Sequence, residues 1–127
     1  MTVDADVAAN VAAEPSELDR VWESNGKPLF RDRAGRPITL RTWSELRLET
    51  SYRTVERTTV GAHEVITAWL GTDQGCSLDD TPPLIFGTIA RNVKEETFDD
   101  RSERFAATES DARHNHHRLV VTMTASL

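Results

Sequence analysis

The amino-acid sequence predicts a small α+β fold, in which an antiparallel sheet of about three main strands packs on one face against a C-terminal helix. The chain has 127 residues, a common size for one domain. Three segments between residues 52 and 90 have the composition of strands. The apolar residues of segment 109–123 recur with the period of a helix.

The first residues differ in composition from the rest. Segment 1–17 is rich in Ala and Val and lacks aromatic residues, so we expect a flexible N-terminal segment 1–17 followed by one domain, 18–127. Asp4 and Asp6 come early and no base precedes Arg20, unlike a secretory signal peptide. No apolar run approaches the roughly 18 residues of a membrane helix. A single cysteine excludes an internal disulfide and indicates a reducing compartment.

Two helices and a turn are predicted in the N-terminal part of the domain. Apolar residues at helical spacing predict a short helix that begins near Pro15 and ends at Asn25. In segment 31–36, an Asp three positions before a Gly predicts a tight turn. Thr42 and Glu45 have the spacing of a capping box, so the second helix is expected to begin at Thr42.

The middle of the chain holds the strands. Residues 52–60 are rich in Thr and Val, residues 64–70 are the most strand-like run, and residues 84–90 are almost all apolar or small. The short connection between the first two suits a hairpin. Because 84–90 is apolar on both sides, it is expected to be central and covered. Residues 71–83 are acidic, contain Gly and Pro, and are expected to form a long loop.

The C-terminal part is expected to hold a loop and a helix. Residues 92–104 are polar, so they are interpreted as a loop that precedes a short edge strand ending at Phe105. Thr108 is the expected cap of the final helix, with Asp111 at the third helical position. The predicted apolar face of this helix consists of Ala112, His116, Leu119, Val120 and Met123.

Several short motifs follow one another in a fixed order. They are an Asp-x-x-Gly-x-Pro-Ile turn, Trp-x-x-Leu, Tyr-x-x-Val-x-x-Thr, Trp-Leu-Gly-x-Asp, and Pro-Pro followed by Phe-x-Thr. In these motifs the chain resembles a family of small proteins of phages and prophages, often of actinobacterial or proteobacterial hosts. The likeness covers residues 29–121. The matching residues are Asp32, Gly35, Pro37, Ile38, Trp43, Leu46, Tyr52, Val55, Thr58, Trp69, Leu70, Gly71, Asp73, Pro82, Pro83, Phe86, Thr88, Arg104, Phe105, Thr108, His116 and Val120.

The chain departs from the family pattern at two positions. Gln74 stands where the family usually has His after the Asp, and Gly87 stands where it usually has Glu after the Phe. If that His and Glu formed a catalytic pair, this chain has lost both. The family has no established biochemical activity. The resemblance therefore implies a phage origin and a fold, and it implies no reaction. With the reducing compartment that the single cysteine indicates, the expected location is the host cytoplasm.

Motifs and charge favour a binding function over catalysis. The sequence has no Gly-x-Ser-x-Gly elbow, no phosphate-binding Gly-rich loop and no recognisable Cys-His pairing. The net charge is −6, but residues 26–60 carry eight bases and four acids, between acidic segments. This pattern permits a basic partner or a homo-oligomer and disfavours direct nucleic-acid binding. We therefore predict a phage accessory protein that binds a host or phage protein, without a cofactor.

The loop 71–83 and the arginines of segment 31–41 (Arg31, Arg33, Arg36 and Arg41) form the predicted binding site. Long loops in compact domains are often functional, and guanidinium groups suit phosphate. The predicted site residues are Asp73, Gln74, Asp79, Asp80, Arg33 and Arg36. One alternative is a small-molecule or nucleotide binder, or a degenerate enzyme, using this loop. That alternative expects a concave pocket near Asp73 with at least one arginine pointing into it.

Two further interpretations concern acids and histidines. Residues 61–100 hold eight acids and two bases, which allows an acidic mimic of nucleic acid against a host defence factor if the acids share one continuous face. His114 and His117 have a spacing that lets them share a helix face, as in some zinc sites. Arg113 and Arg118 flank them and would repel a dication, so no metal is expected.

Overall fold

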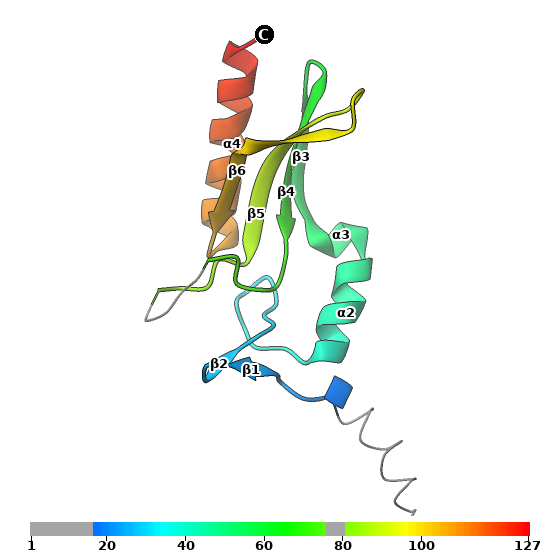
Figure 1. Ribbon diagram of the computed structural model, residues 1–127, viewed down its shortest axis with the longest axis vertical. Coiled ribbons are helices and arrows are strands. Elements are labelled where there is room, and N and C mark those ends of the chain that lie inside the picture. The colour runs from blue at the N-terminus through cyan, green and yellow to red at the C-terminus, as the bar shows by residue number, and fades with distance from the viewer. Residues whose placement is uncertain (1–16, 76–80) are drawn as a thin grey trace, which may run out of the picture.

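A computed structural model describes residues 17–75 and 81–127, which form an α+β fold (Figure 1). Most of the predicted N-terminal segment lies outside the described residues. The strands are β1 (Glu23–Ser24), β2 (Lys27–Pro28), β3 (Thr54–Val60), β4 (His63–Trp69), β5 (Phe86–Asn92) and β6 (Thr97–Ala106), and the helices are α2 (Leu40–Leu48), α3 (Thr50–Arg53) and α4 (Glu109–Ala125). The fold class predicted from the sequence is confirmed.

The main sheet has four antiparallel strands in the order β3-β4-β5-β6. The strand β5 is central, as its apolar sequence predicted. The cross-strand pairs Val65–Ala90 and Trp69–Phe86 consist of fully buried residues. Since side chains alternate between the two faces of a strand, all these residues lie on one face, which is the core face.

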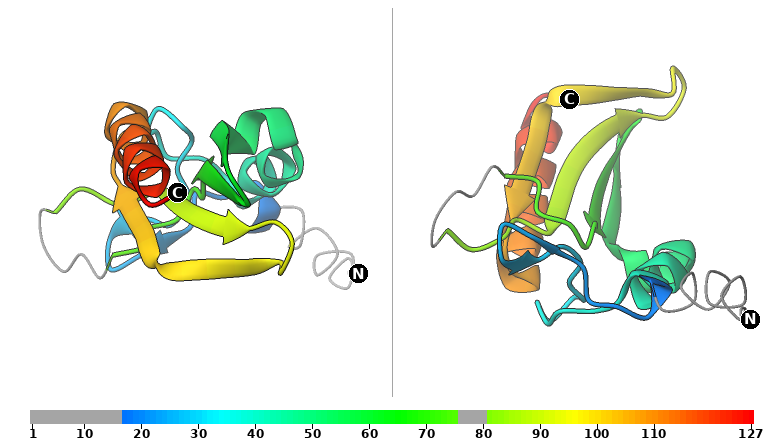
Figure 2. Two further views of the ribbon diagram at one scale, coloured as in Figure 1. Left: turned by 90° about the horizontal axis from the view of Figure 1, so that it is seen from above. Right: turned by 60° about the horizontal axis from the view of Figure 1, so that its bottom comes forward.

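The helix α4 covers the core face of the sheet (Figure 2). It contacts all four strands. Thr108 caps it, since its side-chain oxygen accepts a hydrogen bond from the Asp111 N–H at 3.1 Å, as predicted. Ala112, His116 and Leu119 are its buried residues. The predicted apolar face of α4 therefore closes the core.

The prediction of a loop over residues 92–104 was wrong. The turn 93–96 joins β5 to the ten-residue strand β6. Only Ser102 and Ala106 of β6 are buried, so the polar sequence of this strand reflects an edge strand that faces water. The Ser102 hydroxyl accepts a hydrogen bond from the Ala90 N–H at 2.9 Å, at an irregularity in the β5–β6 register.

The predicted helix ending at Asn25 was also wrong over most of its length. Asn25 and Gly26 both have positive φ, 54° and 76°, and form the turn of the β1–β2 hairpin. Two central residues with positive φ are typical of the two-residue hairpin turn that favours Asn-Gly. The preference of this dipeptide for a hairpin therefore outweighed the helical spacing of the apolar residues before it.

The helix α2 begins before the predicted residue. Its cap is Thr39, whose hydroxyl oxygen accepts from the Thr42 N–H at 3.1 Å, so Thr42 lies within the first turn. After α2, the residues of α3 form a single helical turn, and β3 therefore starts two residues later than predicted. The tight turn at 31–36 is confirmed, with a hydrogen bond from Gly35 N–H to the Asp32 carbonyl.

The N-terminal part of the fold is attached to the end of β4. Its main hydrogen bonds to the rest of the fold end on residues 69–71. Trp43 Nε1 donates to the Leu70 carbonyl at 3.0 Å, and Arg47 Nη1 donates to the Trp69 carbonyl at 3.0 Å. Arg31 N–H donates to the Gly71 carbonyl, and the Arg31 carbonyl accepts from the indole of the last β4 residue, both at 2.9 Å. We call residues 69–71 the anchor segment.

Candidate functional site

A hollow of about 570 Å³ lies between the β1–β2 hairpin and the loop after β4. Ligand pockets have volumes of roughly 300–1,000 Å³, so its size suits a small molecule. Its walls include Ser24, Lys27, Leu29 and Arg31 from the hairpin side and Asp73 and Pro83 from the loop side. A pocket beside Asp73 with an arginine in its wall is what the small-molecule alternative expected, and the arginine is Arg31.

Asp73 shapes the loop that borders the hollow. Its Oδ1 accepts hydrogen bonds from the Gly75 N–H at 3.0 Å and from the Leu84 N–H at 2.9 Å. The carboxylate therefore links Asp73 to Leu84, eleven residues further along the chain. Asp79 and Asp80, two further predicted site residues, lie outside the described part of the chain.

The other predicted site residues do not line the hollow. The Gln74 side-chain amide donates to the Thr72 hydroxyl at 2.9 Å and stays within its own loop. The Arg36 side chain is 78% exposed and pairs with Asp32 at 3.4 Å. Arg33 points toward α4 instead. Of the predicted site residues, Asp73 lines the hollow, whereas the arginine in its wall is Arg31, which was not among them.

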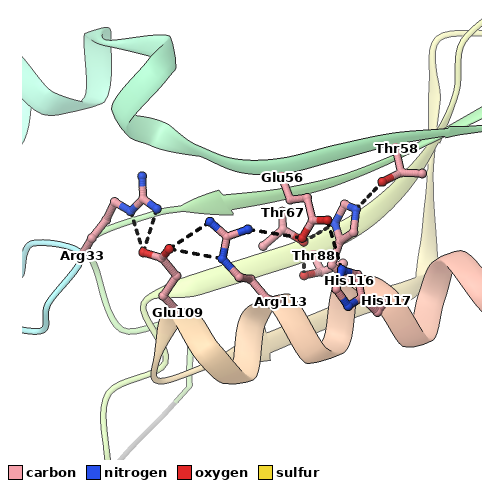
Figure 3. Close-up of polar contacts among 9 residues, drawn as sticks. All are labelled: Arg33, Glu56, Thr58, Thr67, Thr88, Glu109, Arg113, His116 and His117. Carbon is pink, nitrogen blue, oxygen red and sulfur yellow. Dashed lines mark hydrogen bonds and ion pairs between the residues drawn. The ribbon is translucent and has the colours of Figure 1, made fainter.

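Arg33 binds the N-terminal end of α4 (Figure 3). Its Nη2 lies 2.7 Å from Glu109 Oε1, and its Nη1 donates to the Tyr52 carbonyl at 3.0 Å. Arg113 pairs with the other Glu109 oxygen at 3.1 Å. Burial alone would raise the pKa of Glu109, but hydrogen bonds from Arg33 and Arg113 outweigh it, so this pKa is lowered. The network fixes the 31–36 turn against α4.

A chain of hydroxyl groups surrounds His116 beneath α4 (Figure 3). Thr58 Oγ1 lies 2.8 Å from Nε2 and Thr67 Oγ1 lies 2.8 Å from Nδ1 of this histidine. Thr88 Oγ1 lies 2.7 Å from Thr67 Oγ1. The imidazole is fully buried, and burial lowers its pKa. His116 is therefore a neutral core residue whose two ring nitrogens are both hydrogen bonded.

The polar groups under α4 are structural in character. No substrate reaches the His116 ring, because the residue has no exposed surface. His117 is more exposed and lies 3.1 Å from Glu56, which Arg113 also approaches at 3.5 Å. Within residues 17–75 and 81–127, no group of three or more His, Cys, Asp or Glu side chains is placed to hold a metal ion.

The face of the main sheet opposite α4 carries apolar side chains. The alternation along β4 and β5 places Ile66, Ala68 and Ile89 there, since the residues beside them face α4. Leu70 and Phe105 lie beside them, on either side of Gly87. All five apolar residues are partly exposed. We call Ile66, Ala68, Leu70, Ile89 and Phe105 the sheet-face patch.

Charged and aromatic side chains border one end of the sheet-face patch. Glu64 Oε2 lies 3.3 Å from Arg57 and Glu64 Oε1 lies 3.6 Å from Arg91. Phe98 pairs with Arg91 across the β5–β6 register, and its residue is 56% exposed. An aromatic ring and two arginines that share one carboxylate therefore stand next to the apolar residues.

Gly87 lies at the centre of the sheet-face patch. A Cβ atom at this position would be 3.1 Å from Leu70 Cδ1 and 3.5 Å from the Phe105 ring. The absence of a side chain therefore lets Leu70 and Phe105 approach each other across β5. A charged side chain at this position would therefore lie among apolar residues.

The described acids of segment 61–100 do not share one continuous face. Glu95 and Glu96 lie in the turn after β5, and Asp99 and Asp100 lie in the exposed first half of β6. Glu64 is bound between two arginines on the face opposite α4. Asp73 lies in the loop beside the hollow. This arrangement does not favour the nucleic-acid mimic.

Comparison with known proteins gave no match. The scan against models of protein families, the search of curated proteins and the search of solved structures each found nothing similar. Among the described helices, none is long and apolar enough to cross a membrane. The function is therefore inferred from the geometry of the chain itself.

Proposed function

We propose that this protein is a phage accessory protein that binds a protein partner, of the host or of the phage, through the sheet-face patch. The observation that carries the proposal is the apolar surface on the face opposite α4. An antiparallel sheet with one solvated face usually places polar residues on that face. Contiguous apolar residues on a protein surface are typical of interaction sites.

The border of the patch indicates the chemistry of the partner. Two guanidinium groups, Arg57 and Arg91, share the single carboxylate of Glu64, so this cluster offers more guanidinium donors than it has carboxylate acceptors. Phe98 adds an exposed aromatic ring beside them. Arginine and aromatic residues are enriched among those that dominate binding energy. The partner is therefore expected to present an apolar surface with an acidic group at its edge.

Photo-crosslinking in a bacterial host lysate tests the proposal. A photoreactive amino acid at Ile66 is expected to crosslink one protein, and the same group at Val121 on α4, which is 67% exposed, is the matched control. The purified partner is then titrated with Phe98→Ala and Arg57→Glu, each expected to weaken binding by about tenfold or more.

Three outcomes would contradict the proposal. They are equal crosslinking from Ile66 and Val121, unchanged affinity of Phe98→Ala and Arg57→Glu, and crosslinking of the chain only to itself. The last outcome would make the patch a homodimer interface, which a concentration-dependent mass in light scattering would identify.

A further inference from the structure

We infer that the hollow between the β1–β2 hairpin and the loop after β4 binds a small organic anion, with its acidic group at Arg31. This inference is independent of the sheet-face patch, because none of the residues that line the hollow belongs to the patch. It assigns a ligand class to a site that the sequence located only by its loop.

The environment of Arg31 carries the inference. Of the five N–H bonds of a guanidinium, one donates to the Gly35 carbonyl at 2.9 Å, so four lack an acceptor within residues 17–75 and 81–127. The Nε atom is also shielded from water and has no hydrogen-bond partner. No carboxylate among the described residues forms an ion pair with Arg31. Leaving a buried polar group without a partner is costly, and an oxyanion bound at the guanidinium would supply acceptors for its unpaired N–H bonds.

The charges around the hollow favour an anion over a cation. Lys27 and Arg31 line it, and Asp73 is the one acid among its described lining residues. The Asp73 carboxylate already accepts two backbone N–H groups of its own loop. Ser24 and Asn25 contribute a hydroxyl and an amide at the hairpin end, two groups that can donate hydrogen bonds to an oxyanion.

The size and the apolar wall indicate an organic ligand. A hollow of about 570 Å³ is much larger than a single inorganic ion requires. Pro28, Leu29 and Pro83 provide apolar surface, and Leu29 is 39% exposed although it is a large apolar residue. The ligand class is therefore a carboxylate or a phosphate monoester that carries an apolar ring or chain.

Calorimetric titration with simple probes tests the inference on the full chain. Phenyl phosphate and phenylacetate carry both features, inorganic phosphate carries only the charge, and benzyl alcohol carries only the ring. At least one of the first two is expected to bind more tightly than both partial probes. Which of the two binds distinguishes a phosphate site from a carboxylate site.

Matched variants locate the site. Arg31→Gln is expected to weaken binding by about tenfold or more, because a charge-assisted hydrogen bond is lost. Leu29→Asp places a negative charge in the hollow and is expected to weaken binding similarly. If Arg31→Gln fails to fold, this second variant tests whether the anion binds in the hollow. Arg36→Gln removes an exposed arginine of the same turn and should leave the affinity unchanged.

The inference is overturned if neither phenyl phosphate nor phenylacetate binds more tightly than benzyl alcohol. It is also overturned if Arg36→Gln lowers the affinity as much as Arg31→Gln or Leu29→Asp, because the effect would then reflect general charge. Binding at the hollow with no crosslinking at Ile66 would support this inference and reject the proposed function, so the two fail separately.

Discussion

The buried imidazole of His116 lies between the hydroxyls of Thr58 and Thr67, 2.8 Å from each. A hydroxyl both donates and accepts, so either neutral tautomer of the ring is satisfied. The hydrogen bonds to Thr58 and Thr67 hold α4 against β3 and β4. A polar network thus lies inside a core that is otherwise apolar, and every described member of it has a partner.

Stability is expected to fall at acid pH because of His116. Its folded-state pKa is lowered from 6.5 mainly by burial, with Arg113 and His117 adding to the effect and Glu56 opposing it. The unfolded chain therefore binds the proton more readily than the folded chain. The contribution of neutral His116 to the free energy of unfolding is full above pH 6.5 and is lost as pH falls through the folded pKa.

Urea unfolding on both sides of pH 6.5 measures this effect. His116→Gln should show a weaker dependence on pH than the original protein. His114→Gln, at an exposed position of α4, should retain the original dependence. An identical pH dependence for all three proteins would show that His116 does not titrate with unfolding.

Leu119→Asp is expected to unfold the protein. Leu119 is 9% exposed and belongs to the core between α4 and the sheet. Removing a buried leucine costs about 2–5 kcal/mol, and the buried carboxylate adds to this cost, against a typical stability of about 5–15 kcal/mol. Val121→Asp, on the exposed side of α4, should retain the fold. Thermal melting followed by circular dichroism compares the two, and a cooperative Leu119→Asp transition near the original temperature would contradict the packing.

Gly71→Ala is expected to destabilise the protein more than Gly35→Ala. Both glycines have positive φ, 79° and 86°, so both variants carry a backbone cost of roughly 1–2 kcal/mol. At Gly71 the added Cβ would also lie 2.5 Å from Trp43 Nε1 and 2.6 Å from the Trp69 ring, whereas nothing lies within 4 Å at Gly35. Overpacking adds about 1–3 kcal/mol. Equal free energies of unfolding for the two variants would argue against the close contact.

Gly87→Glu is expected to keep the fold and abolish partner binding. The nearest atom to the new Cβ is the end of the Leu70 side chain, which can move, so the loss of stability should stay near 1 kcal/mol. The carboxylate then lies in the sheet-face patch and must be desolvated on binding. Thr122→Glu, exposed on α4, is the control. Retained affinity of Gly87→Glu for the crosslinked partner would move the binding site away from this face.

The elements that the sequence predicted correctly are those with dense apolar patterning. The strands β3, β4 and β5 and the helix α4 each bury one face. Burial of one face makes apolar residues recur at the spacing of a strand or a helix, and this spacing is visible in the sequence. The strand β6 was missed because an edge strand needs few apolar residues. The hairpin at Asn25 is hidden in the sequence because the apolar residues before it have helical spacing, although Asn-Gly itself favours a hairpin turn.

The site residues were only partly predictable, for a different reason. Four arginines lie close together in the sequence between residues 31 and 41. Three of them form ion pairs with different acids: Arg33 with Glu109, Arg36 with Asp32 and Arg41 with Asp19. Among the described residues, Arg31 forms no ion pair with a carboxylate, and the sequence does not reveal this because tertiary contacts decide which arginine pairs with which acid. The sheet-face patch was equally hidden, because the strand sequence is apolar on both faces and does not show which face a helix covers.

The anchor segment sets an order of assembly for the chain. The helices α2 and α3 have no fully buried residue, so residues 17–53 contain little core of their own apart from Phe30. Their tethers end on residues 69–71, which are held in place by the pairing of β4 with β5. The N-terminal part is therefore expected to dock onto a sheet that has already formed. A peptide of residues 17–53 made alone should remain unstructured and should gain structure when mixed with the rest of the chain.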